Sequence, residues 1–434
     1  MNKRDRIQIT LDYIDDNLKS DITAKELSHL AGYSLFHYYR LFQMAVGTPL
    51  MQYVLHRRLL HAVFEISCGN RMTDVALSYG FSNHSGFYKA FIREFGYTPA
   101  MYLKTFKVKK PYRINLKEEE HIMITHKRIK EILKNWDFEN EKIADIVHPE
   151  TGTISENAYY IGDDYVLKIT PNLGKLKKHT EVSSALADVG ISAATQKKTL
   201  NGEEYIYEGE LFFYLTRRIT GNPMMSGDLY EGDYLNKARF VGEIVGQLSE
   251  ALKNLDAVVN EANLFVTVSE WAMEKAGSMV DIPESLREQY FQNFGSLYSR
   301  LPKQIIHRNP HPGNIIVEDD TWGFVDFDLT ERNVRIFDPC YAATAILSES
   351  FLNSSETRHD RWIEIYKAII SGYDDVVKLT AEEKAAIPFI ILSIQFICLA
   401  WFKGRDKLAE VLKINIEMTK WIMERFDQLK LEEA

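Results

Sequence analysis

The first hundred residues alternate between short amphipathic stretches and glycine turns, and the pattern occurs twice. A Thr-x-x-Glu capping box precedes a short helix that ends at Gly32, and a longer aromatic-rich helix then runs to a Gly-Thr-Pro stop. In the second copy a short helix starts at Thr73 and ends at Gly80, Ser82 precedes an aromatic-rich helix, and Gly96 closes it. Helix, glycine turn and helix is the helix-turn-helix pattern, so the sequence predicts two of these motifs.

A long periodic stretch, residues 49–66, separates the two copies and predicts one helix with Pro49 at its first position. Its length of roughly 27 Å could set two recognition helices about one DNA turn apart, roughly 34 Å. The aromatic residues of the two recognition helices are spaced for burial in the core. They are Tyr38, Phe42, Phe87, Phe91 and Phe95.

The outer faces of the two recognition helices carry polar and aromatic side chains that we expect to face DNA. They are Phe36, His37, Tyr39 and Arg40 in the first helix, and His84, Ser85, Tyr88 and Lys89 in the second. Arg40 and Lys89 are best suited to guanine edges or phosphate. For any one of these residues, a solvated surface position or a phosphate contact is as well supported as base readout.

Residues 5–106 resemble the DNA-binding domain of the AraC/XylS family of bacterial transcription regulators. The segment DVALSYGFSNHSGFYKAFIREFGYTPAMY carries the closest resemblance. The resemblance implies double-stranded DNA as a partner and places the base-reading positions on the outward residues named above. Regulators of this family usually carry the sensor first, and here the order is reversed.

The pattern changes after residue 107, where a charged segment with Pro111 shows no sustained period and reads as a linker. Beyond it, helices and strands alternate, which predicts an α+β domain. The expected helices cover about 126–136, 238–255 and 341–347, with a C-terminal bundle that opens at a capping box from Thr380. The expected strands cover 152–161, 165–169 and 211–216. The run 388–402 is shorter than a membrane span, and we expect a buried helix there.

The segment from His307 to Asp328, HRNPHPGNIIVEDDTWGFVDFD, predicts a polar loop followed by two short strands that end in carboxylates. Polar loops of this kind hold metal and substrate at phosphoryl-transfer sites. The segment resembles the catalytic and metal-binding loops of the aminoglycoside phosphotransferase and choline kinase group. That group has the pattern His-Gly-Asp-x-His-x-x-Asn, followed by a hydrophobic-Asp-Phe/Trp-Asp/Glu segment. The positions that match are His307, His311, Asn314 and Asp326.

The resemblance extends over about residues 126–425 and implies a bilobal kinase-like fold. It makes Asn314 and Asp326 metal ligands and implies Mg²⁺ with ATP or another nucleotide as cofactors. Lys168, in the middle of an apolar strand, needs an anion, and Glu181 on the next helix is its expected partner near the nucleotide phosphates. Thr216 and Ile219 lie at the expected interlobe hinge, where backbone groups hold adenine. The glycine-rich phosphate loop is weak, with only Gly152 and Asn157 in its place.

Two positions depart from the group's pattern: Arg308 replaces a glycine, and Asn309 replaces the catalytic aspartate. A carboxamide can orient a hydroxyl but cannot take its proton, and a positioned general base is typically worth about 10²–10⁴ in rate. The site is therefore expected to bind a nucleotide and to be a poor catalyst. Arg308 could pair with a phosphate or another anionic ligand.

Charge is distributed unevenly. Residues 1–113 contain 16 basic and 9 acidic side chains, whereas the whole chain has a net charge of −9. A basic front joined to an acidic body predicts a polyanion partner for the front only. The three cysteines, Cys68, Cys340 and Cys398, form no CxxC pair, and the N-terminus has no apolar signal region. A cytoplasmic location without membrane contact is expected.

These features predict an all-α tandem helix-turn-helix domain at 1–107, a linker at 108–125 and a kinase-like domain at 126–434. The N-lobe of the latter covers about 126–219 and the C-lobe about 220–434. The first hypothesis is a transcription regulator whose kinase-like half senses a small molecule or nucleotide. Two alternatives stay open: an active small-molecule phosphotransferase fused to its own regulator, and a fusion whose acidic half serves only protein contacts. The oligomeric state, including a homodimer, is also open.

Overall fold

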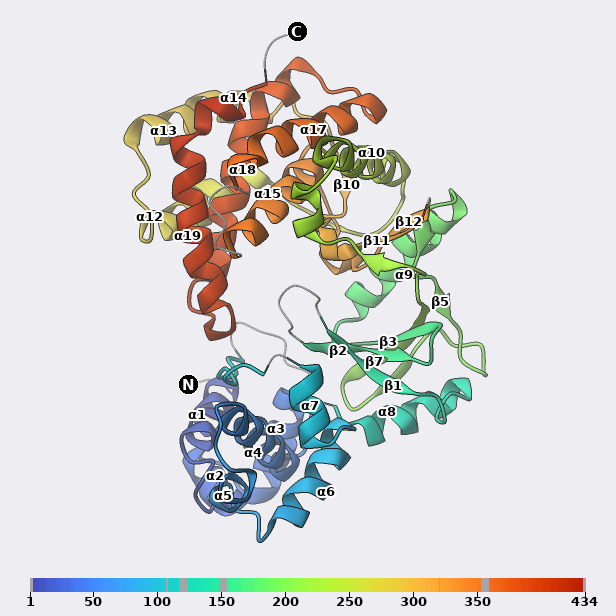
Figure 1. The fold of residues 1–434 in the computed structure, drawn as a ribbon, viewed down its shortest axis with the longest axis vertical. Coiled ribbons are helices and arrows are strands. Elements are labelled where there is room, and N and C mark those ends of the chain that lie inside the picture. The colour runs from blue at the N-terminus through green and yellow to red at the C-terminus, as the bar shows by residue number, and fades with distance from the viewer. Residues whose placement is uncertain are drawn as a thin grey trace. The chain divides into compact units, whose positions relative to one another are not determined.

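A computed structural model of the chain describes residues 3–106, 108–116, 124–147, 154–319, 321–352 and 359–431, without the side chains of 349, 352 and 407. The described residues form two compact units. Unit 1 comprises Met1–Leu173 and Gln196–Arg218, and unit 2 comprises Gly174–Thr195 and Ile219–Ala434. The helical front and the first β-sheet thus belong to the same unit (Figure 1).

Seven helices form the front of unit 1. They are α1 (Lys3–Asp16), α2 (Ala24–Leu30), α3 (Leu35–Val46), α4 (Leu50–Ser67), α5 (Met72–Ser78), α6 (His84–Phe95) and α7 (Pro99–Thr105). The Thr23 hydroxyl accepts a hydrogen bond from the Glu26 backbone N–H and caps α2, as predicted. Three predicted starts are shifted: α4 begins at Leu50 with Pro49 as its cap, and α5 begins at Met72 rather than Thr73. The cap of α6 is Asn83, whose side chain accepts from the Gly86 N–H.

The two helix-turn-helix copies are built alike. The turns at Gly32 and Gly80 have φ of 70° and 83°, a left-handed conformation that glycine adopts without strain. An arginine from the preceding long helix covers each turn: a Cβ on Gly32 would meet Arg6, and one on Gly80 would meet Arg58. Four of the five predicted core aromatics are fully buried, and Phe95 is half-buried against Phe91 and Tyr102. The predicted core face is therefore confirmed.

The segment 108–116 contains no helix or strand and packs on the helical front through Val108, Tyr112, Ile114 and Leu116. The Gln8 carboxamide of α1 donates to the Ile114 carbonyl and accepts from the Leu116 N–H, each at 2.8 Å. The buried Arg57 of α4 forms a bidentate ion pair with Asp15 and also donates to the Tyr112 carbonyl at 2.8 Å. Half of the predicted linker is thus held against α1 and α4, while residues 117–123 lie outside the described residues.

The rest of unit 1 is a six-stranded antiparallel sheet in the order β1-β2-β3-β7-β5, with β6 paired to β7. Its strands are β1 (Ile143–Val147), β2 (Ile154–Ile161), β3 (Tyr165–Thr170), β5 (Gln196–Lys197), β6 (Ile206–Glu208) and β7 (Leu211–Arg217). The helix α8 (His126–Leu133) and the short turn η1 (Lys134–Trp136) pack on the apolar residues of this sheet. Val147 and Ile154 contact the core of the helical front instead, so the two parts of unit 1 share apolar contacts.

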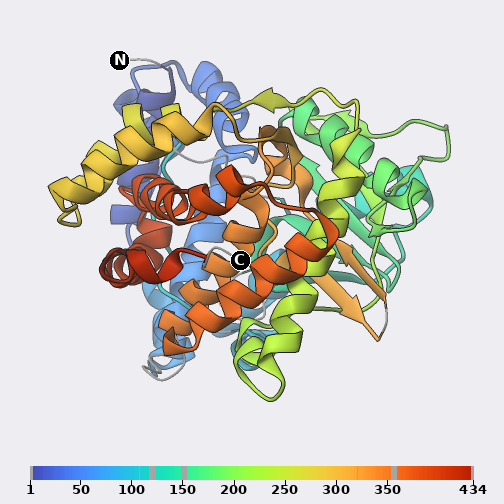
Figure 2. The ribbon, with the colours of Figure 1, turned by 90° about the horizontal axis from the view of Figure 1, so that it is seen from above.

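Unit 2 is mainly helical, and its helices cover one continuous core (Figure 2). The long ones are α9 (Leu173–Asp188), α10 (Tyr234–Lys253), α15 (Phe337–Leu352), α17 (Trp362–Val376), α18 (Ala381–Phe402) and α19 (Ala409–Glu424). Two small sheets carry the polar loops. One has the order β10-β13-β9, with β10 (Lys303–Ile306), β13 (Glu331–Val334) and β9 (Asn260–Glu261). The other has the order β4-β12-β11-β8, with β4 (Ser192–Ala193), β12 (Thr321–Phe324), β11 (Ile315–Glu318) and β8 (Asn222–Pro223).

The helix α18 is long and apolar enough to cross a membrane by length and composition alone. However, 72% of its most apolar window is buried inside the protein, which is typical of a core helix. Thr380 and Glu383 form the predicted capping box at its start, with both reciprocal hydrogen bonds present. The predicted buried helix is confirmed.

The close packing of α10 on α17 generates a prediction about stability. A Cβ on Gly242 would lie 2.0 Å from the Ile369 carbonyl oxygen, so even alanine must push the two helices apart. We expect Gly242→Ala to lower the free energy of unfolding by about 1–3 kcal/mol. Gly277→Ala is the matched control, because a Cβ there would make only ordinary contacts. Urea denaturation followed by circular dichroism measures both, and equal stability of the two variants would contradict the packing argument.

Candidate functional site

The polar loop that follows β10 is held by a buried carboxylate. One oxygen of Asp338 accepts the His307 N–H at 2.8 Å and the other accepts the Arg308 N–H at 2.9 Å. The His307 ring is fully buried, and its Nε2 lies 3.1 Å from the Val325 carbonyl while its Nδ1 faces the Asn309 N–H. Donation from Nε2 and acceptance at Nδ1 indicate a neutral imidazole. The loop is thus fixed on both sides by α15 and by the end of β12.

The structure brings Asn309 and Asn314 together. The Asn314 side-chain N–H donates to the Asn309 carbonyl at 3.0 Å, and the His311 N–H donates to the same carbonyl at 2.9 Å. Because the amide nitrogen of Asn314 is committed, its oxygen is left as the acceptor. The Asn309 side chain makes no hydrogen bond within the described residues. It is therefore available to a ligand, as a donor or acceptor but not as a base.

Arg308 is engaged within its own loop. Its guanidinium pairs with Glu331 at 2.8 Å and lies 4.2 Å from the centre of the Phe337 ring. Its backbone has φ of 75°, which a non-glycine residue rarely adopts. The Arg308 cation is thus used to hold its own loop, and this explains how arginine is accepted at a position where the related loops have glycine.

Asp326 follows the predicted hairpin. The two strands of this hairpin, β11 and β12, pair between Ile315 and Phe324. The Val325 N–H donates to the Asn314 carbonyl at 3.0 Å, which brings the two predicted metal-ligand positions close along the backbone. Among the described residues, no cluster of three or more His, Cys, Asp or Glu side chains could hold a metal. One carboxylate and one amide oxygen nevertheless fit Mg²⁺, which usually takes one or two carboxylates and completes its shell with phosphates and water.

Two residues of α9 that the sequence reasoning missed contact the segment that follows β12. The ammonium of Lys178, only 9% exposed, donates to the Thr330 carbonyl at 2.9 Å. Burial lowers the pKa of Lys178, and the nearby carboxylates of Asp328 and Glu331 oppose that shift. The buried His179 ring packs on Phe327, which in turn packs on His307. His179, Val182 and Leu186 share one face of α9 at helical spacing. A histidine on this apolar face was the sequence feature that could have pointed to a buried position.

The predicted nucleotide residues fall in different units, so their joint arrangement stays a prediction. Lys168 lies on β3 opposite Ala158 and Tyr214, within the sheet of unit 1. Glu181 is exposed on α9 of unit 2. Thr216 is buried and stands between β3 and β5, and its hydroxyl donates to the Val166 carbonyl at 3.4 Å. Ile219 follows the end of β7. Gly152 lies outside the described residues.

The predicted DNA-facing residues line the outer faces of α3 and α6. Phe36 is 83% exposed, and Tyr39, Arg40, His84, Ser85 and Lys89 are also exposed. His37 and Tyr88 are half-buried, because His37 stacks on Tyr33 and Tyr88 lies beside His84. Solvent access is therefore available at every position where the sequence predicts a DNA contact, and the contacts themselves stay predictions.

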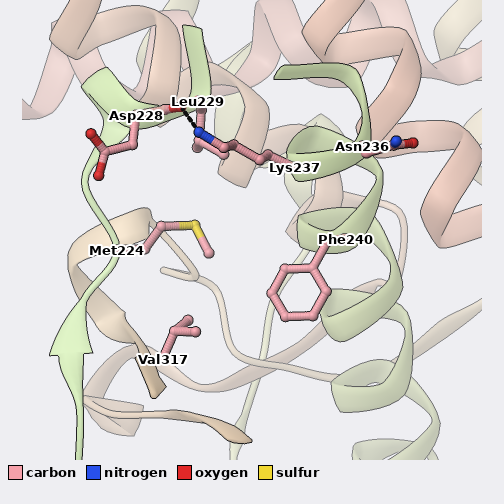
Figure 3. Close-up of a pocket in the computed structure, with 7 residues that line it drawn as sticks. All are labelled: Met224, Asp228, Leu229, Asn236, Lys237, Phe240 and Val317. Atoms are coloured by element: carbon pink, nitrogen blue, oxygen red, sulfur yellow. Dashed lines mark hydrogen bonds between the residues drawn. The ribbon is translucent and has the colours of Figure 1, made fainter. Parts of the chain in front are cut away.

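Unit 2 also has a hollow of about 380 Å³ between η2 (Ser226–Tyr230), α10 and β11 (Figure 3). Met224, Phe240 and Val317 point toward one another across it, and Asp228 and Lys237 stand at one end. The Lys237 ammonium is occupied, since it donates to the carbonyls of Asp228 and Glu231. The hollow suits an apolar group.

Residues 149–377, more than half of the chain, match the family described as the Phosphotransferase enzyme family. The chain belongs to this family. Residues 27–105 match a family described as a Helix-turn-helix domain. The N-terminal region is an AraC-type helix-turn-helix domain, as the sequence indicated.

Two of the regulators that resemble the helical front are matched over only part of their length. The chain is 32% identical over 91 residues to the HTH-type transcriptional activator AarP of Providencia stuartii, covering 21% of this chain and 67% of AarP. It is 24% identical over 157 residues to the Right origin-binding protein of Escherichia coli (strain K12), covering 34% of this chain and 54% of that protein. The chain thus spans between half and two thirds of these two relatives.

Two solved structures of kinases share the fold of the remainder. A microcompartment-associated aminopropanol kinase aligns with a TM-score of 0.52 at 14% identity, covering 70% of this chain and 99% of that one. The amicoumacin kinase hAmiN, solved with AMP-PNP, Ca²⁺ and Ami, aligns with a TM-score of 0.51 at 15% identity, covering 70% and 96%. At such identities the likeness shows the fold alone. The predicted fold class, tandem helix-turn-helix followed by an α+β kinase-like domain, is confirmed.

The buried carboxyl group of Asp338, which holds the polar loop after β10, makes the stability of the protein depend on pH. Burial raises the pKa of Asp338 from 3.8 to about 7, although two backbone N–H groups and Arg308 favour the carboxylate. Because the folded pKa is the higher one, stability is lost as pH rises from about 4 to about 7, by the order of a few kcal/mol. We expect Asp338→Asn to flatten this part of the stability–pH curve, measured by urea denaturation at successive pH values. Asp360→Asn, at an exposed position, should keep the slope.

Proposed function

We propose that this protein is a transcription regulator whose kinase-like domain binds a nucleotide or small molecule and transmits its occupancy to the helix-turn-helix domain. The observation that carries the proposal is the state of the polar loop. The metal-ligand positions Asn314 and Asp326 keep suitable oxygens, while Asn309 replaces the acid that would accept a proton. Binding chemistry is retained and a step of the transfer chemistry is missing.

The loss at Asn309 is chemical rather than steric. The loop around it is fully supported: Asp338 holds its start, and Asn314 holds the Asn309 carbonyl. An aspartate at 309 could take the proton of a hydroxyl acceptor, whereas the carboxamide can only orient the hydroxyl. A rate lower by about 10²–10⁴ is the expected consequence. When bound, Mg²⁺ would neutralise nucleotide phosphates, and Asn314 and Asp326 would hold it.

Unit 1 offers a physical connection for signalling. The β1 and β2 strands of the kinase-like domain contact the helical front through Val147 and Ile154. The hydroxyl of Tyr112, in the segment that Arg57 holds, donates to Glu156 of β2. A ligand that stabilises the sheet therefore also acts on the helix-turn-helix domain. Any such coupling is reciprocal, so DNA must change ligand affinity by the same factor.

The alternative is an active phosphotransferase joined to its own regulator. It is favoured by the likeness to the amicoumacin kinase, whose structure contains a nucleotide analogue and Ca²⁺. Both readings share a cytoplasmic location, with the three cysteines free. They differ in whether unaltered protein with Asn309 transfers phosphate.

The first prediction of the proposal concerns DNA. The full chain should bind duplex DNA with a strongly negative salt slope, about −0.9 per phosphate neutralised. Arg40→Ala should weaken one half of the binding site and Lys89→Ala the other, each by about 1–3 kcal/mol if the side chain reads a base. Selection from random duplexes followed by anisotropy titration tests both. Lys420→Ala in unit 2 is the control, and binding indifferent to salt would overturn the assignment.

The second prediction concerns the nucleotide. Mg-ATP or another Mg-nucleotide at about 100 times its dissociation constant should add about 2.7 kcal/mol of stability, measured by thermal shift of the full chain. Asp326→Ala should abolish the effect, because it removes the carboxylate of the metal site. Asp360→Ala is the control, because Asp360 is exposed and lies outside the site. Asn157 lies in the predicted phosphate loop and is therefore unsuitable as a control.

The outcome that separates sensor from enzyme is phosphate transfer. The unaltered chain should transfer none above background to a panel of amino alcohols and antibiotics, and Asn309→Asp should gain at most about 10⁴-fold. ATP-dependent phosphorylation by the unaltered protein, lost in Asp326→Ala, would replace the sensor by the kinase. Absence of any nucleotide binding would remove the nucleotide from the proposal.

A further inference from the structure

The helix α8 of the kinase-like domain begins at the end of the second recognition helix. The imidazole of His126, its first residue, lies over Gly96, the residue that ends α6: a Cβ on Gly96 would be 2.7 Å from Nδ1. His126 also lies 3.7 Å from Asp145 of β1. Figure 1 shows α8 running away from α6 below the sheet, on whose apolar residues it packs. Both helices belong to unit 1, so α8 continues the surface of the helix-turn-helix domain.

The helix α8 has one apolar face and one basic face. Ile129, Ile132 and Leu133 are buried against the sheet. On the opposite side, three lysines follow one another at helical spacing and are exposed: Lys127, Lys130 and, in the adjoining turn η1, Lys134. The spacing i, i+3, i+7 places their ammonium groups in one row.

The charge of this row is not neutralised by neighbouring carboxylates. Glu131 is the acidic residue of α8, and it pairs with Arg128, which also pairs with Glu208. Within the described part of the chain, none of the three lysine side chains forms a hydrogen bond or an ion pair. A row of three free ammonium groups is an ordinary solvated surface unless a polyanion lies beside it. The neighbouring helix α6 is proposed to bind such a polyanion, duplex DNA.

The exposed face of α6 carries Lys89 and, one turn later, Arg93, before the helix ends at Gly96. We propose that the lysine row of α8 binds the phosphate backbone of duplex DNA next to the site read by α6. The inference rests on the proposed DNA binding by α6. From Lys127 to Lys134 the row covers about 10 Å, which corresponds to about three base-pair rises of 3.4 Å. The three ammonium groups therefore suit about two to three phosphates of one strand, and the row carries no means of reading sequence.

The test removes the three charges in the full chain. The variant Lys127→Gln, Lys130→Gln, Lys134→Gln is compared with unaltered protein on a duplex selected from a random pool by the unaltered protein. The log–log slope of affinity against salt, between about 50 and 200 mM, should become shallower by about 2, since each lost phosphate contact removes about 0.9. Sequence preference should not change, and hydroxyl-radical protection should shrink on the flank next to the α6 half-site.

A matched variant controls for net charge. Lys253→Gln, Lys413→Gln, Lys420→Gln removes the same three charges from exposed positions of unit 2. An unchanged slope in the α8 variant, or an equal change in this control, would overturn the proposal while leaving DNA binding by α6 intact. Failure of the unaltered chain to bind any duplex would instead remove both the DNA-binding proposal and this one. Equal melting temperatures of the variants and the unaltered chain establish that folding is intact.

Discussion

The loop of the kinase-like domain depends on a single carboxyl group that has no access to water. Both oxygens of Asp338 are used, one for the N–H of His307 and one for the N–H of Arg308. Without them, two buried donors would be left unsatisfied, and the left-handed backbone at Arg308 would lose its hydrogen bond to α15. The position of Asn309, and through its carbonyl the orientation of the Asn314 amide, follows from that anchor. The Arg308–Glu331 pair reinforces the same turn from its outer side.

Local signals in the sequence were enough for most of the fold. The spacing of aromatic residues predicted which faces of α3 and α6 are buried, and the turn glycines predicted where their partner helices stop. The hairpin of β11 and β12 followed from two apolar runs around an acidic turn. Helix starts were less accurate: α5 begins after Arg71 without a side-chain cap, and the polar side chain that caps α6 is Asn83 rather than its neighbour Ser82. Adjacent residues of similar chemistry compete for such positions, and only the backbone geometry distinguishes them.

The features that the sequence could not supply depend on long-range contacts. Lys178 was overlooked because its partner is a backbone carbonyl 152 residues away, which has no sequence signature. The sequence offered a phosphate or another anionic ligand as a partner for Arg308. It could not predict the pairing with Glu331, because Glu331 is distant in sequence and is brought close by the pairing of β10 with β13. The basic face of α8 was overlooked for a different reason. A count of charge that stops at residue 113 assigns the helix to the acidic body, whereas the folded chain places it beside α6.

The carboxamide of Gln8 makes the backbone hydrogen bonds to segment 114–116 that a neighbouring strand would make. It donates to one backbone carbonyl and accepts from the backbone N–H two residues later. An extended segment with free backbone groups is a template on which another chain can add a strand. Here one edge of that template is already occupied by a side chain from α1, and Ile114 and Leu116 are turned into the core. The Gln8 contacts therefore oppose the addition of a strand from another chain at residues 114–116.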